Sequence, residues 1–306
     1  MSSRLEEQIR ADIVEAGRRM DARGYVASND GNISTRLDPD RLLTTPKSVP
    51  KGYMTPDMMV IVDYEGRKLA GDRDPSSELP MHLEIYRNRP DVNAVVHAHP
   101  PTATGFATAG VPLTRAVLAE VVTTLGSIPI AEYGTPSTAE LPAAVRKYIK
   151  AHDGMLLANH GAVTCGKDVM SAYYKMETIE HFAKISLVAR LLGRENLLAR
   201  EEVDRLQGLR GAYGIKSPAP ICADPSEALA VLDSGNPAMC QVVQAPQGDG
   251  QRLVPDVIGD STPSLASTSR AGYGARPPQP AEAADEIRLT YRELSALIQD
   301  AIRQLR

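Results

Sequence analysis

The pattern of apolar residues breaks off at about residue 216, and this break limits the folds that the sequence can adopt. Before the break, helical periods alternate with short runs of β-branched residues, as they do in domains that pack helices on a sheet. After it, residues 217–284 are rich in Pro, Gly, Ser, Ala and Asp and keep no period. We therefore predict an α/β (α+β) domain at 1–216, a flexible linker at 217–284 and an amphipathic helix at 285–306.

Several elements of the first part can be placed from the sequence. Residues 94–99 have the β-branched character of a strand. Residues 155–159 and 162–166 are expected to form a hairpin with His160 at its tip. A long helix is expected at 168–192, because a glycine follows that can end it.

Charge and composition exclude several classes of partner. The net charge is -4 and the pI is about 5.9, so the chain has no broad cationic surface for a nucleic acid. No stretch approaches the roughly 20 apolar residues that span a bilayer, and the acids of the N-terminal segment do not fit a signal peptide. The spacing of Cys165, Cys222 and Cys240 fits neither a disulfide pair nor a metal site. We expect a cytoplasmic protein that binds neither nucleic acid nor membrane.

The histidines of the segment VVHAHP carry the strongest chemical signal. Alternate residues of a strand point to the same side, so His97 and His99 can bind one ion together. His160, at the expected hairpin tip, can turn toward that strand end. Three imidazoles with an open fourth position are typical of catalytic zinc, whereas structural zinc sites favour four ligands and cysteine. An isolated H-x-H is more often a pair of ordinary strand histidines, so the assignment depends on neighbouring motifs.

Glu78, in the segment GDRDPSSELPMH, is the candidate acid/base. A carboxylate beside a divalent ion can ligate it or move a proton to and from a substrate carbon. Glu78 also stands just before an expected helix that starts at Leu79, where an acid is ordinary. The two roles are compatible, because a helix N-terminus also offers free amides to a phosphate. His82 is expected to pack or orient, and His152 and His181 to be ordinary residues.

Three short polar segments form a candidate phosphate site. The candidate residues are Asn32 in SNDGNIS, Lys47 and Ser48 in TTPKSVP, and Ser76 and Ser77 at the start of the helix. Backbone amides of such turns can converge on an anion, and Lys47 adds positive charge. Each turn alone is most often only a turn, whereas the three together predict an oxyanion cradle.

Taken in order, these segments resemble one family. The motifs GNIS, TTPKS, PSSE, VVHAHP, YGT and NHG, spread over roughly residues 4–216, are similar to those of the class II aldolase and adducin family, and most of all to its L-fuculose-1-phosphate aldolases. The resemblance implies a central, mostly antiparallel sheet flanked by helices, and a cyclic homotetramer with sites at subunit interfaces.

The resemblance also assigns roles to individual residues. It implies one Zn²⁺ per subunit with His97, His99 and His160 as ligands, and Glu78 as the acid/base. The implied phosphate-binding residues are Asn32, Lys47, Ser48, Ser76 and Ser77. Tyr213, in GAYGI, matches a mobile tail tyrosine that the family uses near the aldehyde oxygen, although a helix-end anchor would look the same.

The activity that the resemblance implies is cleavage of a deoxy-ketose 1-phosphate, such as L-fuculose 1-phosphate or L-rhamnulose 1-phosphate, to dihydroxyacetone phosphate and lactaldehyde through a metal-stabilised enediolate. Two departures bear on the substrate. Leu118 stands where the relatives have a second tyrosine, and Lys47 and Ser48 stand where they have threonine and glycine. A sugar-phosphate dehydratase shares the histidines and a nearby glutamate. A pentulose-phosphate 4-epimerase carries aspartate in place of Glu78, and an adducin-like scaffold lacks the metal.

The C-terminal segment has a resemblance of its own. A linker that ends in a short amphipathic helix is similar to the encapsulation peptides that direct enzymes into bacterial microcompartments. The helix expected at 285–306 has acids first and arginines last, as the helix dipole favours, and its apolar side could fold against a shell protein. Docking on its own catalytic domain, or extension of the oligomer, is the other interpretation.

Overall fold

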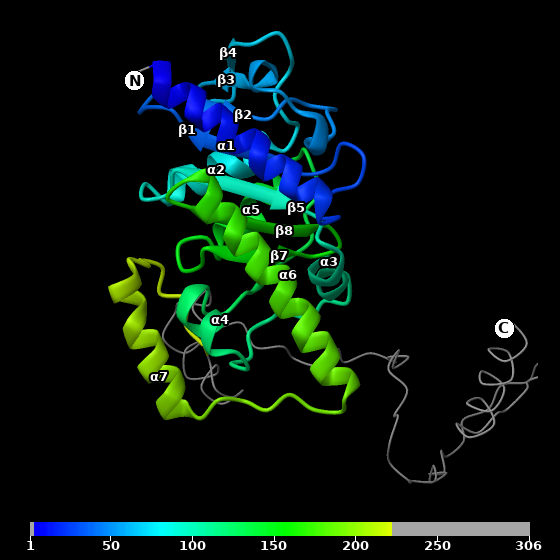
Figure 1. The fold of residues 1–306 in the computed structure, drawn as a ribbon, viewed down its shortest axis with the longest axis vertical. Coiled ribbons are helices and arrows are strands. Elements are labelled where there is room, and N and C mark those ends of the chain that lie inside the picture. The colour runs from blue at the N-terminus through cyan, green and yellow to red at the C-terminus, as the bar shows by residue number, and fades with distance from the viewer. Residues whose placement is uncertain (1–2, 222–306) are drawn as a thin grey trace, which may run out of the picture. The chain divides into compact units, whose positions relative to one another are not determined.

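A single mixed sheet forms the centre of the part of the chain that the computed structural model describes, residues 3–221 (Figure 1). Its eight strands lie in the order β4-β3-β2-β1-β5-β8-β7-β6. Neighbours are antiparallel except β6 and β7, which are parallel. The predicted α/β fold with a mostly antiparallel sheet is confirmed. Most of the predicted linker and the whole predicted terminal helix lie outside the described residues.

The elements have the following bounds. The strands are β1 (Asn32–Arg36), β2 (Leu42–Thr44), β3 (Val60–Val62), β4 (Lys68–Ala70), β5 (Ala94–Ala98), β6 (Ile130–Ala131), β7 (Gly154–Leu157) and β8 (Gly161–Gly166). The α-helices are α1 (Ser3–Ala22), α2 (Leu79–Asn88), α3 (Pro101–Thr108), α4 (Ala119–Thr124), α5 (Glu140–Arg146), α6 (Val169–Leu191) and α7 (Arg200–Leu209). Short 3₁₀ helices are η1 (Lys51–Tyr53), η2 (Pro56–Met58) and η3 (Arg210–Tyr213).

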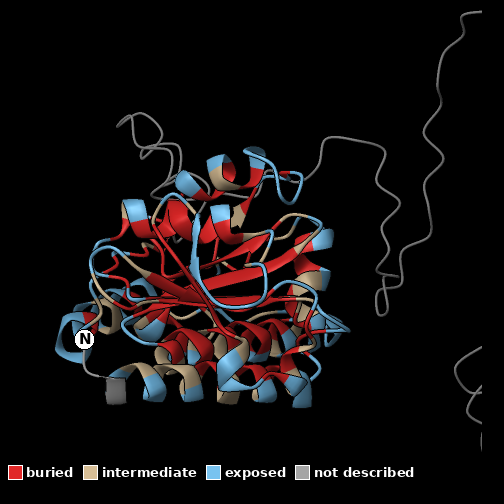
Figure 2. Ribbon diagram, turned by 90° about the horizontal axis from the view of Figure 1, so that it is seen from above, coloured by how far each residue is buried: buried red, intermediate tan, exposed pale blue. Residues whose placement is uncertain are grey.

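Helices cover both faces of the sheet. Helices α1, α3 and α6 lie on one face, and α2 and α5 pack together on the other (Figure 1). Strand β5 contributes side chains to the apolar cores on both faces of the sheet. Val95 belongs to the core under α2 and α5, and Val96 belongs to the core under α6. Figure 2 shows the resulting pattern, with buried strands and inner helix faces and exposed outer helix faces.

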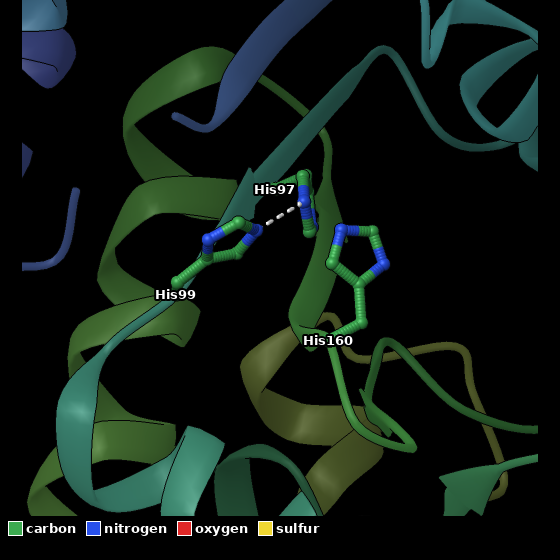
Figure 3. A group of neighbouring side chains, drawn as sticks. All are labelled: His97, His99 and His160. Carbon is green, nitrogen blue, oxygen red and sulfur yellow. Dashed lines mark hydrogen bonds between the residues drawn. The ribbon is translucent and has the colours of Figure 1, made fainter. Parts of the chain in front are cut away.

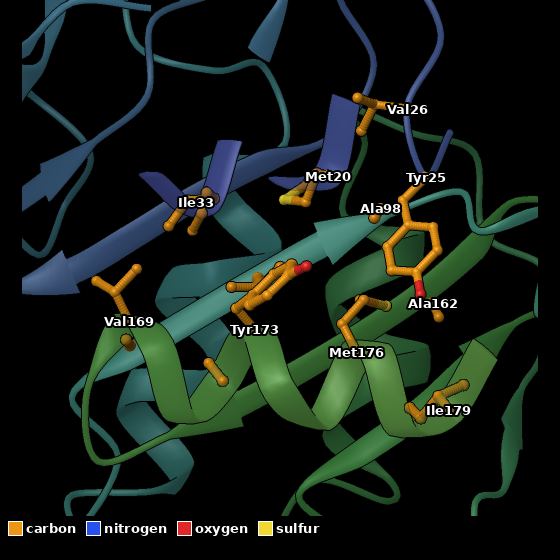
Figure 4. Packing of buried hydrophobic residues seen from close by; sticks show 14 of the residues in the cluster. Met20, Tyr25, Val26, Ile33, Ala98, Ala162, Val169, Tyr173, Met176 and Ile179 are labelled. Atoms are coloured by element: carbon orange, nitrogen blue, oxygen red, sulfur yellow. The ribbon is translucent and has the colours of Figure 1, made fainter. Parts of the chain in front are cut away.

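The long helix α6 has sequence signals at both ends. Asp168 accepts a hydrogen bond from the amide of Ser171 in a capping box, and Gly193 follows the helix with a φ of +102°. The helix expected at 168–192 is thus confirmed. Its inner side packs on β1, β5 and β8 through a row of fully buried apolar residues, namely Val169, Tyr173, Met176 and Ile179 (Figure 4). Burying a side chain of this size stabilises the fold by about 1.5–3 kcal/mol.

The packed domain continues past the predicted boundary at residue 216. The Ala219 amide donates to the Ala151 carbonyl, and the Ser127 amide donates to the Ala219 carbonyl. Gly126 makes this approach feasible, because a Cβ there would lie 2.3 Å from the Ala219 oxygen. The segment at 217–221, expected in a linker, therefore packs against the domain. Within the described residues, no helix is both long and apolar enough to cross a membrane.

Candidate metal centre and phosphate pocket

Three histidines meet at one end of strand β5. His97 is in β5, His99 follows the strand, and His160 lies in the turn that joins β7 to β8 (Figure 3). One ligand-capable atom from each lies within 4.8 Å of the others. The Nε2 atoms of His97 and His99 are 3.1 Å apart. The hairpin predicted around His160 is confirmed, and its turn brings this third imidazole to the end of β5.

Neighbouring groups fix the orientation of these rings. The Nδ1 of His97 lies 2.9 Å from the Ala162 carbonyl and donates to it, so the Nε2 lone pair is left facing the other histidines. Asp30 lies 3.3 Å from Nδ1 of His99 in the same supporting role. Gly161 lets β8 approach closely, because a Cβ there would lie 2.6 Å from the His99 ring.

The donor set fits a divalent ion such as zinc. Nitrogen ligands at 2.0–2.1 Å from a tetrahedral zinc lie roughly 3.3 Å from one another, which is close to the separation of the His97 and His99 Nε2 atoms. Burial lowers the pKa of His97 to about 3, so the ring is neutral at pH 7. A cation between these two neutral nitrogens, which face each other at this distance, would be stabilised by both of them.

Glu78 lies beside this cluster, just before helix α2. Its carboxylate oxygens are 3.3 Å from Nε2 of His97 and 3.1 Å from Nε2 of His160. The Asn32 amide donates a 2.7 Å hydrogen bond to it from β1, where Asn32 pairs with His97. Burial favours the neutral form, but the hydrogen bonds from His160 and from the Asn32 amide hold the pKa of Glu78 below its usual range. The group is therefore a carboxylate within reach of any ligand held by the histidines.

A polar cavity of about 270 Å³ opens next to Glu78. All the residues predicted for phosphate binding line it, namely Asn32, Lys47, Ser48, Ser76 and Ser77. His99 and His160 line it as well, so the histidine cluster and the polar turns share one cavity. Two further lining residues, Asp30 and Lys51, were not found from the sequence. Asp30 adjoins a motif glycine, but no pattern in the sequence marks Lys51.

The family of the chain follows from its match to a known domain. The Class II Aldolase and Adducin N-terminal domain matches residues 11–187, which is more than half of the chain. The chain belongs to the class II aldolase and adducin family.

Relatives of this class II aldolase family member catalyse more than one reaction. The chain is 33% identical over 211 residues to a 5-deoxy-D-ribulose 1-phosphate aldolase of Bacillus thuringiensis, a match that covers 69% of this chain and 99% of the relative. It is 34% identical over 187 residues to a 3-oxo-tetronate 4-phosphate decarboxylase of Pectobacterium atrosepticum, with 60% of this chain and 85% of the relative covered. A solved L-fuculose 1-phosphate aldolase superposes with a TM-score of 0.63 at 27% identity, over 70% of this chain and 98% of that one.

Two residues named from the family resemblance lie elsewhere in the class II aldolase domain. Tyr213 is 68% exposed and lines a cavity with Gly166. Gly166 pairs with Ala94 at the opposite end of the β5–β8 ladder from His97. Within one chain, Tyr213 is thus at the other end of the sheet from the histidines. Leu118 lines a third cavity, beside α6.

The remaining histidines and the described cysteine have structural surroundings. His82 is buried, with Nδ1 at 2.7 Å from the Ser34 hydroxyl. His152 is buried with Nδ1 at 3.1 Å from the Ser127 carbonyl, and His181 is exposed on α6. Burial raises the pKa of Cys165 to about 12, so its thiol is inert at neutral pH. Cys222 and Cys240 lie outside the described residues.

Proposed function

We propose that the chain is a zinc-dependent aldolase that cleaves a deoxy-ketose 1-phosphate, of the L-fuculose or L-rhamnulose 1-phosphate type, to dihydroxyacetone phosphate and lactaldehyde. The observation that carries the proposal is the position of Glu78. Its carboxylate lies against two imidazoles of the histidine cluster and lines the polar cavity of the phosphate candidates. A ketose 1-phosphate has its phosphate close to the carbonyl and hydroxyl groups that an ion would bind, so it fits a site of this shape.

Each residue of the site would have a separate role in the reaction. A divalent cation held by the histidines would act as a Lewis acid toward the substrate oxygens. Lys47, Ser76 and Ser77 would hold the phosphate, and Asn32 would keep one oxygen of Glu78 fixed through its 2.7 Å hydrogen bond. As the carbon–carbon bond breaks, the hydroxyl that becomes the aldehyde oxygen would lose its proton. Glu78, a carboxylate at rest, would accept a proton and pass it to the carbon that retains the electron pair.

The aldehyde side of the site requires a second subunit. In this proposal, Tyr213 exchanges a proton with the aldehyde oxygen. Because Tyr213 lies at the far end of its own sheet, the Tyr213 that acts at a given site would come from a neighbouring copy. A homotetramer with sites at its interfaces, as the family resemblance implies, would meet this need. Leu118 in place of a second tyrosine would alter the selectivity for the aldehyde.

The alternatives differ in their products. A sugar-phosphate dehydratase would release water without breaking a carbon–carbon bond. A 4-epimerase would return an isomer, although its aspartate differs from Glu78. The decarboxylase among the relatives makes a 3-oxo acid phosphate a further substrate to test, with CO₂ as the product. An adducin-like scaffold would bind no metal, and the clustering of three imidazoles around a carboxylate speaks against it.

The decisive experiment is a panel of ketose 1-phosphates assayed by coupled detection of dihydroxyacetone phosphate. We expect cleavage that is lost after exhaustive chelation and restored by zinc. Glu78→Gln should keep zinc but lose most of the turnover. Full cleavage activity in that variant would remove Glu78 from the mechanism, and activity that survives chelation would contradict the metal dependence. The alternatives would be favoured if no ketose yields dihydroxyacetone phosphate and the protein instead releases water or CO₂ or isomerises its substrate.

The segment at 285–306 adds a separate proposal about location. We infer that this segment, which the sequence predicts to be helical, binds a microcompartment shell protein, since the predicted linker and helix pattern suits a targeting peptide and lactaldehyde is a reactive product. Deleting 285–306 should leave cleavage intact and abolish co-assembly with shell protein. Retained co-assembly would contradict targeting.

A further inference from the structure

Lys51 is a fully buried lysine in the wall of the candidate phosphate cavity. It begins the short helix η1 and is only 1% exposed. Its ammonium donates to the Asn29 carbonyl at 3.0 Å and to the Val49 carbonyl at 2.8 Å. One carbonyl belongs to the loop before β1, which leads to Asn32, and the other to the loop that carries Lys47. A single side chain therefore connects the two turns that form this end of the cavity.

The charge of Lys51 has no carboxylate partner in the described part of the chain, where it forms no ion pair within 4.0 Å. Its neighbours are neutral carbonyls, and an ammonium has three donors, of which these carbonyls use two. Burial lowers the pKa of Lys51 to about 8, although Asp30 and Glu78 act to raise it. A buried ammonium is strongly destabilising without a counter-ion, so an anion in the adjoining cavity would offset this penalty.

The backbone of Lys51 is held rigidly against helix α1. Gly17 of α1 packs so closely that a Cβ there would lie 2.7 Å from the Lys51 carbonyl oxygen. Gly52 meets the same helix, because a Cβ on it would lie 2.4 Å from the Asp21 carboxylate. The lysine is thus held in place before any ligand arrives, which reduces the entropy lost on binding. Lys47, by contrast, is exposed at the rim.

We propose that Lys51 is a specificity-determining residue that makes the site selective for a dianionic phosphate. Its ammonium contacts the anion from inside the wall while it holds the Asn29 and Val49 loops together. The inference rests on the proposed function only in taking a phosphate ester as substrate. It adds that the buried charge, more than the exposed Lys47, distinguishes a sugar phosphate from the free sugar.

The test compares neutral and charged replacements of Lys51 in the zinc-loaded, full-length protein. Calorimetry with inorganic phosphate should show binding at least about tenfold weaker in Lys51→Met, because a charge-assisted hydrogen bond is lost. Zinc stoichiometry should be unchanged. Lys51→Arg should recover part of the affinity. Lys68→Met is the matched control, since Lys68 is a surface lysine paired with Asp74, and it should bind phosphate as the wild type does. Lys51→Gln replaces Lys51→Met if the latter does not fold.

Kinetics separate a charge contact from a purely structural role. The KM of a ketose 1-phosphate should rise in Lys51→Met by a larger factor than any loss in the slow turnover of the unphosphorylated ketose, because only the phosphate ester loses the charge contact. Equal losses for both substrates, or unchanged phosphate binding in a folded neutral variant, would overturn the proposal. Weaker phosphate binding without any ketose cleavage would support the role of Lys51 and contradict the proposed aldolase activity. Ketose cleavage with unchanged phosphate binding would support the aldolase activity and contradict the role of Lys51.

Discussion

Gly31 occupies a tightly constrained backbone position next to the histidine cluster, and replacing it by alanine should destabilise the protein strongly. Its φ is +72°, and an added Cβ would lie 2.7 Å from Val26 Cγ1 and 2.9 Å from the His97 carbonyl oxygen. The left-handed conformation costs an L-residue about 1–2 kcal/mol. Overpacking adds about 1–3 kcal/mol. We therefore expect Gly31→Ala to lower the free energy of unfolding by about 2–5 kcal/mol.

Gly24→Ala is the matched control for this prediction. Gly24 has a similar φ of +66°, but a Cβ there would meet nothing within 4 Å. It should therefore lose only the conformational part, about 1–2 kcal/mol. Urea unfolding of both variants at neutral pH, followed by circular dichroism, measures the two effects. Since each kcal/mol lowers the Tm of a domain of this size by about 2–4 °C, a thermal scan should separate them as well.

The position of Gly31 also ties this variant to the metal centre. Asp30 supports His99 on one side of Gly31, and Asn32 holds Glu78 on the other. A displaced turn should therefore weaken zinc binding in Gly31→Ala and leave it unchanged in Gly24→Ala. Equal destabilisation of the two variants, with equal zinc affinity, would refute the close-packing argument.

Three further predictions concern single contacts. His97→Ala should release the metal, because it removes the buried central imidazole; a full zinc content by atomic absorption would contradict its assignment as a ligand. Asp153→Asn should destabilise the protein by about 3–5 kcal/mol, because Arg89 and Lys175 lose a buried partner. Burial opposes the charge on Asp153, but Lys175 and Arg89 hold its pKa below its usual range. The carboxylate therefore stabilises the fold fully above about pH 4 and loses this effect as the pH falls further. The free energies of unfolding of wild type and variant should thus converge in acid, whereas a difference that stays constant with pH would refute the ion pairs. Asp168→Ala should lower the free energy of unfolding by about 1 kcal/mol, because α6 loses its N-terminal cap. An unchanged midpoint of urea unfolding would show that the cap does not stabilise the fold.

The parts of the fold that the sequence predicted well have local causes. The ends of α6 are set by Asp168 and by the glycine after the helix, and both signals lie within a few residues of the boundary they determine. The alternation of strand side chains likewise predicted that His97 and His99 lie close together, and they do so at the end of β5, although His99 is already just past the strand. Here a short-range rule was sufficient, because the geometry of one element decides the outcome.

The parts that escaped prediction depend on contacts between distant segments. Lys51 reaches the Asn29 carbonyl across 22 positions, and a lysine in a polar loop looks the same whether it is buried or exposed. Residues 217–221 have the composition of a linker but fit against Gly126, which only the folded domain presents. Tyr213 follows a family motif, yet it lines a cavity with Gly166, at the end of the β5–β8 ladder away from His97.

The order of the strands has a consequence for when an ion can be captured. Neighbours of β5 in the sheet are β1, which carries Asn32, and β8, which begins just after His160. A chain still emerging from the ribosome offers only two of the three histidines, His97 and His99. The third becomes available when the hairpin around His160 has been synthesised and β8 has paired with β5. Since long-range pairing of this kind is slow, metal loading should be a late step of maturation, and the nascent chain should compete poorly for zinc with other cellular binders.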